Sequence, residues 1–380
     1  MGRATGGRLP FRRAHPGYPR PAAACRTRAR RIVQDAGAAL MNSLLERPSE
    51  PPSSVGYSVI TLPEYARDLD ELRRGAERWL GSDAMTRLLA AFGKELREST
   101  FRGRLVELEA VAAELFDARR GRERWEADYR DHPREVVDAT RAVVAAVYRD
   151  PAGPPRGDLG APTHVLVPGG RLRSCLLRAE LVRDLLSAGL PPAPIWGLAS
   201  RRPATDSEVR LGQEFARGSV QDELDAMSVA LGWALDIPQV RAQERPLEER
   251  LPAEVRELRG GPASVIGLAA PAEPDAGRVT TAGTYRFFAA STDLSSLDHL
   301  LIVTSAIHAP FQHALALGHL ALPTGARVTS VGAHITTSAL ADVRETWSTG
   351  EWLQEILSAI RSLRRMDDEV IAFGRDQAGA

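Results

Sequence analysis

The chain has 380 residues, of which 43% are hydrophobic, enough for a sizeable core and typical of about two domains. Its 49 basic and 49 acidic side chains cancel, so net charge gives no support to a protein that coats a polyanion. The two cysteines, Cys25 and Cys175, lie far apart in unlike contexts, which argues against a disulfide framework and favours a reducing cytoplasm. No apolar run reaches the ~18 residues that span a bilayer, so we expect no membrane anchor.

Residues 1–55 are predicted to be a disordered, arginine-rich tail. Nine arginines lie between Arg3 and Arg31, before the first acid, Asp35, and the intervening residues are rich in Pro, Gly and Ala. Such a segment buries too little apolar surface to offset the entropy of ordering it. Three other interpretations stay open: a basic arm for nucleic acid, a transit-like peptide, or upstream sequence before a true start at Met41.

Residues 56–150 are predicted to form a small helical domain. Apolar residues recur at helical spacing in four segments, which begin at a Thr61–Glu64 capping box, after Ser82, near Phe101 and near Pro133. The region holds no catalytic constellation, so we expect a lid, an oligomer surface or simple packing. A Pro- and Gly-rich linker is predicted at residues 151–161.

Residues 162–370 are predicted to form a three-layer, Rossmann-like α/β domain with a mostly parallel sheet. Short apolar runs alternate there with segments of helical periodicity, the pattern of a sheet covered by helices. The strand candidates are residues 164–167, 194–199, 299–304 and 327–331, and residues 264–269 and 280–290 are either further strands or an inserted hairpin. A helix is predicted over 251–258, and the last helix is predicted to begin at a capping box in residues 348–351.

The turn after the first core strand is the first candidate site. In an open parallel sheet, ligands bind beyond the carboxyl ends of the strands at the switch point. Gly169 and Gly170 let a ligand approach the backbone there, and the N-terminus of the next helix attracts an anion. Arg173 adds positive charge, so we expect these three residues to bind an anion. Cys175, near the same helix start, is either a reactive thiolate or a buried structural cysteine.

The loop after the second strand brings further polar residues to the same edge, namely Ser200, Arg201, Ser207 and Glu208. We expect Glu208 to take part in catalysis by contacting a ligand hydroxyl or an ion. Asp222, Glu223 and Asp225 lie at or near a helix start, where acids suit the helix dipole. The alternative is that one of these acids meets a ligand hydroxyl or a divalent ion that bridges to phosphate.

The segment Thr304–His308 is the most suggestive site, because it follows the strongest strand pattern in the chain. Thr304 or Ser305 can cap the next helix, and His308 falls in its first turn, where an imidazole could serve as acid or base near pH 7. Gln312 lies one turn further on the same face, and we expect Thr304, Ser305 and Gln312 to contact the ligand across a common hollow from the glycine turn. The alternative is an N-cap followed by an ordinary surface histidine. The sequence has no HExxH motif and no CxxC pair, so we expect no tightly held metal.

The order of these motifs over about residues 160–365 resembles the YdcF-like, SanA-like and ElyC-like bacterial proteins, which have a Rossmann-like fold. The likeness lies in the glycine pair after a strand, in Ser207-Glu208, and in the VTSAIH stretch that ends at His308. Gln312 stands where that family usually has Arg, and Asp225 is the nearest match to its Asn. The resemblance implies binding of a nucleotide-like molecule such as S-adenosylmethionine.

We therefore expect a soluble, cytoplasmic protein that binds a small phosphorylated or nucleotide-type ligand, either a nucleotide or S-adenosylmethionine. As an enzyme it would carry out transfer or hydrolysis, with His308 as acid or base. The alternative is a non-catalytic ligand-binding or regulatory partner protein. Oligomerisation through the helical domain is compatible with either interpretation, and nucleic-acid binding through the arginine-rich tail is a third.

Overall fold

The computed structural model describes residues 57–59, 62, 69–121, 127–147, 159–215, 220–237, 253–259, 264–272, 279–334 and 347–378. The tail predicted over residues 1–55 and most of the linker predicted over 151–161 lie outside these ranges.

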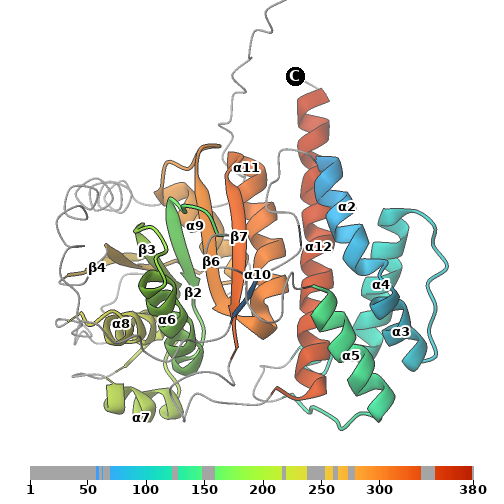
Figure 1. The fold of residues 1–380 in the computed structure, drawn as a ribbon, viewed down its shortest axis with the longest axis horizontal. Helices are drawn as coiled ribbons and strands as arrows, with labels where there is room; N and C mark the ends of the chain where they lie inside the picture. Colours follow the sequence, from blue (N-terminus) through green and yellow to red (C-terminus); the bar gives the residue numbers. More distant parts are fainter. Residues whose placement is uncertain are drawn as a thin grey trace, which may run out of the picture.

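The described residues form one seven-stranded sheet in the order β1-β7-β6-β2-β3-β5-β4 (Figure 1). Its five central strands are parallel, and β1 and β4 pair antiparallel at the two edges. From β2 the chain first adds β3 and β5 on one side and then β6 and β7 on the other, so the switch point lies between β2 and β6. The bounds are β1 Tyr57–Val59, β2 His164–Pro168, β3 Ile195–Ala199, β4 Glu254–Leu258, β5 Val265–Ala269, β6 His299–Ser305 and β7 Arg327–Ala333.

Alternate side chains of the central strands pack into two hydrophobic clusters, one on each face of the sheet. Val165 and Val167 face α6 (Leu172–Ser187) and α8 (Glu223–Ala234). Leu166 faces the opposite way, toward α9 (Thr281–Ser291) and α10 (Ala309–Ala316). The chain therefore has the three-layer, Rossmann-like α/β fold that its alternating pattern predicts.

A helical layer, defined as α2–α5, lies beyond α10 and packs on the long C-terminal helix α12 (Figure 1). Buried Asp367 of α12 joins the two parts, because its carboxylate accepts hydrogen bonds from Arg73 of α2 (3.1 Å) and Arg102 of α4 (2.6 Å). The layer and one face of the sheet share a single hydrophobic cluster. The bounds are α2 Leu69–Leu80, α3 Asp83–Ala91, α4 Phe101–Phe116, α5 Arg134–Ala146 and α12 Thr349–Ala378.

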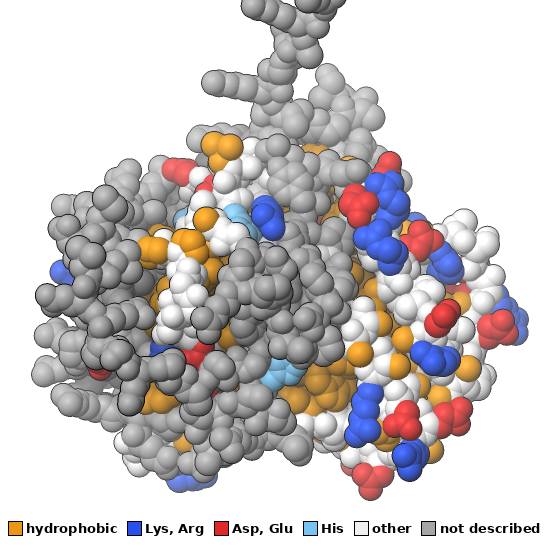
Figure 2. All heavy atoms as spheres, in the orientation of Figure 1, with side chains coloured by type: hydrophobic (Ala, Val, Ile, Leu, Met, Phe, Trp, Pro, Cys, Tyr) orange, Lys and Arg blue, Asp and Glu red, His pale blue; other side chains and the backbone are white. Residues whose placement is uncertain are grey.

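The outward surface of the helical layer carries basic and acidic side chains interspersed (Figure 2). Several of them pair across short distances, including Arg78 with Glu71 (3.0 Å) and Lys94 with Glu114 (3.0 Å). Such mixing is typical of a solvated face and produces no field of one sign. Among the helices that the structure describes, none combines the length and apolar character needed to cross a bilayer.

Two predicted elements differ from the structure, and one strand was not predicted. Residues 254–258, predicted within a helix, form the edge strand β4, because pairing with β5 buries Val255 and Leu258. Residues 280–290, predicted as a strand, form α9, because the hydroxyl of Thr280 caps the N–H of Gly283. The strand β1 was not predicted, and three residues carry too little pattern to show one.

Candidate functional site

The carboxyl ends of β2 and β6 are neighbours at the switch point, since Leu166 of β2 pairs in parallel with Ile302 of β6. A buried arginine of α6 spans the two turns that follow these strands. Arg178 is 2% exposed, and its Nη1 donates to the carbonyl oxygens of Pro168 and Gly169, both at 2.5 Å. Its Nε donates to Oγ of Ser305 at 3.2 Å. The space between the two turns is therefore filled by a side chain of the protein.

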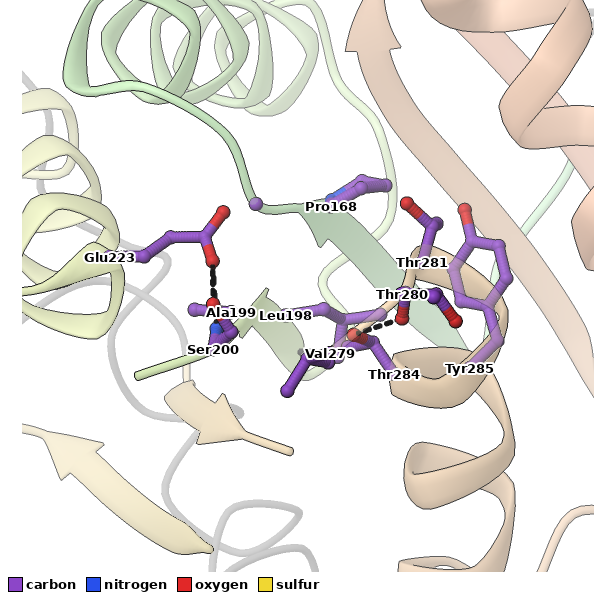
Figure 3. Close-up of a pocket in the computed structure, with 11 residues that line it drawn as sticks. Pro168, Leu198, Ala199, Ser200, Glu223, Val279, Thr280, Thr281, Thr284 and Tyr285 are labelled. Atoms are coloured by element: carbon purple, nitrogen blue, oxygen red, sulfur yellow. Dashed lines mark hydrogen bonds between the residues drawn. The ribbon is translucent and has the colours of Figure 1, made fainter. Parts of the chain in front are cut away.

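A polar cavity of about 70 Å³ lies next to this arginine, beyond the ends of β2 and β3 (Figure 3). We call it the β2–β3 cavity. In Figure 3, Glu223 lies on one side of it and hydroxyl groups from the start of α9 lie on the other. The cavity is lined by Pro168, Gly169, Leu198, Ala199, Ser200, Glu223, Val279, Thr280, Thr281, Thr284 and Tyr285.

Glu223, the first residue of α8, places a carboxylate in the β2–β3 cavity. Its Oε2 accepts hydrogen bonds from the backbone N–H of Ser200 (3.0 Å) and from the Ser200 hydroxyl. Its Oε1 lies over Gly169, where a Cβ atom would stand only 2.6 Å away, so this contact requires glycine. Burial raises the pKa of Glu223 above its ordinary range, and the hydrogen bonds from Ser200 and the charge of Arg202 offset part of that effect.

The opposite wall consists of hydroxyl groups at the start of α9. Thr284 donates from Oγ1 to the carbonyl oxygen of Thr280 at 3.1 Å. Tyr285 donates from its hydroxyl to Oε1 of Gln312 at 2.7 Å. Burial raises the pKa of Tyr285 far above its usual value, so its hydroxyl stays protonated at every physiological pH. Both hydroxyls already donate their single proton within the protein, so toward a small polar group they present acceptor lone pairs, as the carboxylate of Glu223 does.

Glu208, predicted to be catalytic, is 3% exposed and holds the loop after β3 against the start of α6. Its Oε1 accepts from the backbone N–H of Leu172 at 3.1 Å, and its two oxygens accept from Arg202 at 2.9 and 3.0 Å. Burial opposes ionisation of Glu208, but hydrogen bonds from Arg202 and Thr205 outweigh it and lower the pKa. These contacts make Glu208 a structural anchor, and its catalytic role stays a prediction.

Arg201, Asp222 and Asp225 belong to a buried ion-pair network that fastens β4 to the start of α8. Arg201 pairs with Asp222 at 2.7 Å and also with Glu254 of β4. Arg256 of β4 pairs with Asp225 at 3.0 Å. Asp222 also caps α8, because its Oδ1 accepts from the N–H of Asp225 at 2.9 Å. Both acids therefore lie at the start of α8 and contact groups of the protein there, in agreement with the helix-start interpretation of their role.

The other predicted residues lie around the cavity without lining it among the described residues. Arg173 and Ser207 are exposed, and Gly170 follows the glycine that does line it. The Oγ1 of buried Thr304 has no hydrogen-bond partner among the residues that the structure describes. The His308 ring lies edge-on to Trp347, with centroids 6.0 Å apart. Of the predicted set, the cavity therefore contains Gly169 and Ser200.

Cys175 is a buried structural cysteine, the second of the two interpretations given for it. It is fully buried, and burial raises the pKa of its thiol to about 12. The thiol therefore stays protonated near neutral pH, where a nucleophile would need the thiolate. Within the described ranges, no group of three or more His, Cys, Asp or Glu side chains is placed to hold a metal ion.

Sequence reasoning missed the α9 wall and did not single out Glu223 from its neighbours. The sequence feature that could have indicated the α9 wall is the Thr280-Thr281 pair, because threonine is favoured at a helix N-cap. The β-branched and aromatic residues that follow favour a strand, and that assignment hid the cap.

The comparisons point to relatives of one kind. A family model described as the Rv3785 N-terminal domain matches residues 64–147, from just before α2 to just after α5. The uncharacterized protein Rv3785 of Mycobacterium tuberculosis is 27% identical over 347 residues, covering 83% of this chain and 95% of that protein. The uncharacterized protein Mb3814 of Mycobacterium bovis matches with the same identity and coverage. No solved structure matches the chain.

These findings correct one expectation. The resemblance to the YdcF-like, SanA-like and ElyC-like proteins is wrong, because the family model and the relatives are of the Rv3785 type. The shared motif order followed from the parallel α/β topology, in which glycine turns and hydroxyl caps recur at strand ends.

Proposed function

We propose that the β2–β3 cavity binds the hydroxyl-bearing part of a small, nucleotide-type ligand, such as a nucleotide or S-adenosylmethionine. The observation that carries this proposal is the lining: hydroxyl groups from Ser200 and the start of α9 face the carboxylate of Glu223 at the carboxyl ends of two parallel strands. Ligands of open α/β sheets bind at this edge.

The chemistry of the lining supports a hydroxylated ligand. A sugar hydroxyl can donate hydrogen bonds, and the cavity offers acceptors for it: the carboxylate of Glu223 and the oxygens of the hydroxyl groups in the lining. An acidic side chain near a strand end is the usual partner of ribose hydroxyls in dinucleotide-binding α/β folds. The cavity volume of about 70 Å³ suits the edge of a sugar ring, with the rest of the ligand outside it.

The arrangement supports binding more directly than catalysis. The acid or base predicted from the sequence, His308, packs beside Trp347 and is not among the residues that line the cavity. A transferase or hydrolase step through His308 stays a prediction. A non-catalytic ligand-binding or regulatory role needs no residue beyond those that line the cavity.

The proposal is tested by calorimetric titration of the full chain with adenosine, adenosine nucleotides and S-adenosylmethionine. Thr284→Val, which removes a cavity hydroxyl with little change of shape, should weaken binding about tenfold. Thr292→Val is the matched control, because Thr292 makes the same backbone hydrogen bond (2.9 Å, to Phe288) at the other end of α9. Equal affinity in Thr284→Val and wild type, or no binding of any of these compounds, would contradict the proposal.

A further inference from the structure

We infer that the β2–β3 cavity selects the uncharged sugar part of its ligand and excludes phosphate. Carboxylates of the protein occupy the two places at this edge where a phosphate would otherwise bind, which we call the anion positions. The inference rests on the proposed function and names the ligand class more narrowly. It also revises the expectation that Gly169, Gly170 and Arg173 bind an anion.

The first anion position is the N-terminus of α6. The free backbone N–H groups of a helix start, together with the helix dipole, normally make such a turn a phosphate site. Here the N–H of Leu172, the first residue of α6, donates to Oε1 of Glu208 at 3.1 Å. Glu208 is itself 3% exposed and fixed by Arg202 and Thr205. An incoming phosphate would have to displace this buried carboxylate.

The second anion position is the space over the glycine turn. A glycine there usually lets the backbone approach a pyrophosphate closely. In this chain Oε1 of Glu223 takes that space, 2.6 Å from the position of a Cβ atom on Gly169. The carboxylate is held in place through its other oxygen by the N–H of Ser200 at 3.0 Å.

Two of the cations near this edge, Arg202 and Arg178, donate their hydrogen bonds within the protein. Arg202 donates to both oxygens of Glu208, and Arg178 donates to the carbonyls of Pro168 and Gly169 and to Ser305. Among the described residues that line the cavity, none is Lys or Arg. The start of α9 lies across the cavity from Glu223 (Figure 3), and there the Thr280 hydroxyl accepts the N–H of Gly283 at 3.0 Å, so this helix end is capped by the protein. A phosphate would therefore meet like charge in a partly desolvated site.

A titration of the full chain with adenosine, adenosine monophosphate and inorganic phosphate tests the inference. Wild type should bind adenosine at least about tenfold more tightly than the monophosphate, a difference of about 1.4 kcal/mol. Inorganic phosphate should leave the amide resonances of Gly169 and Gly170 unshifted. Glu223→Gln should reduce the discrimination and let phosphate shift both resonances. Glu257→Gln is the control. Glu257 lies on edge strand β4 and pairs with Arg259, so this variant removes the same charge at a position outside the cavity lining.

The outcomes separate the two proposals. Equal binding of adenosine and its monophosphate, or phosphate-induced shifts at Gly169 and Gly170 in wild type, overturns the inference and leaves the proposed function standing. If adenosine does not bind, the proposed function fails for that ligand, and the phosphate titrations of wild type and Glu223→Gln still decide whether carboxylates close the anion positions. Loss of discrimination in Glu257→Gln as well would assign the effect to net charge and overturn the inference.

Discussion

The ends of β2 and β6 lie side by side on one edge of the sheet, but their surroundings differ. After β2, Gly169 faces the β2–β3 cavity. After β6, Ser305 accepts a hydrogen bond from Arg178, and further along α10 Gln312 accepts one from Tyr285. Parallel topology brings strand ends together, whereas the side chains packed above each end decide whether a ligand can reach it.

Arg178 bridges the two ends, and removing it should have the largest effect. Arg178→Met keeps most of the volume but leaves the carbonyls of Pro168 and Gly169 without their charged donor. We expect the free energy of unfolding to fall by about 3–5 kcal/mol, measured by urea denaturation. Arg173→Met, at an exposed position of the same helix, should stay within about 0.5 kcal/mol of wild type. Similar values for both variants would show that Arg178 does not hold the two ends together.

The glycine pair offers a second comparison. A Cβ at Gly169 would meet Glu223 at 2.6 Å and the backbone oxygen of Leu198 at 2.7 Å, and the backbone atom cannot move easily. Gly169→Ala should therefore lower the free energy of unfolding by about 1–3 kcal/mol and abolish ligand binding. A Cβ at Gly170 meets its nearest neighbours at 3.4 Å, so Gly170→Ala should retain ligand binding. Retained binding in Gly169→Ala would place the ligand elsewhere.

The two buried glutamates should show opposite pH effects on stability. Burial raises the pKa of Glu223, so the folded state holds its proton more tightly than the unfolded state. Its contribution to the free energy of unfolding therefore falls as pH rises above the ordinary carboxyl range. Hydrogen bonds from Arg202 and Thr205 outweigh the effect of burial and lower the pKa of Glu208, so its contribution is lost as pH falls.

Urea denaturation across pH compares Glu223→Gln and Glu208→Gln with wild type. The difference between wild type and each variant should slope downward with pH for Glu223 and upward for Glu208. Slopes of the same sign would mean that Glu223 is solvated in solution, and the β2–β3 cavity would then lack its buried carboxylate.

The smallest effect should come from the β6 end. His308→Ala should leave the ligand affinity of the full chain within about twofold of wild type, because His308 does not line the cavity among the described residues. Calorimetric titration beside Thr284→Val makes the comparison direct. A loss of affinity as large as that of Thr284→Val would bring His308 into the site, as the sequence predicts.

The strands could be predicted where burial on both faces produces continuous apolar runs. Residues 164–167 and 299–304 are such runs, and they form β2 and β6. Residues 254–258 and 280–290 lack that signal, because an edge strand and a capped amphipathic helix both mix polar with apolar residues. Their assignments depended on partners distant in the chain, β5 for the strand and the packing of α9 on the sheet for the helix.

The candidate site could be predicted only in outline. The sequence indicates polar residues at the strand ends, and Gly169 and Ser200 do line the cavity. It does not separate the three acids at the start of α8. Asp222 and Asp225 pair with arginines of distant segments, and Glu223 between them lines the β2–β3 cavity.

The sequence alone determines that this protein has a parallel α/β sheet and at which edge of the sheet the glycine turn lies, because strand burial and helix periodicity are local patterns. Which acid lines the cavity, and which carboxylates fill the positions of an anion, was decided only when α7 (Asp206–Phe215), α8 and β4 packed together. A carboxylate's role depends on the cation or N–H that reaches it, and the N–H of Leu172 reaches Glu208, and Arg256 reaches Asp225, only through the tertiary fold.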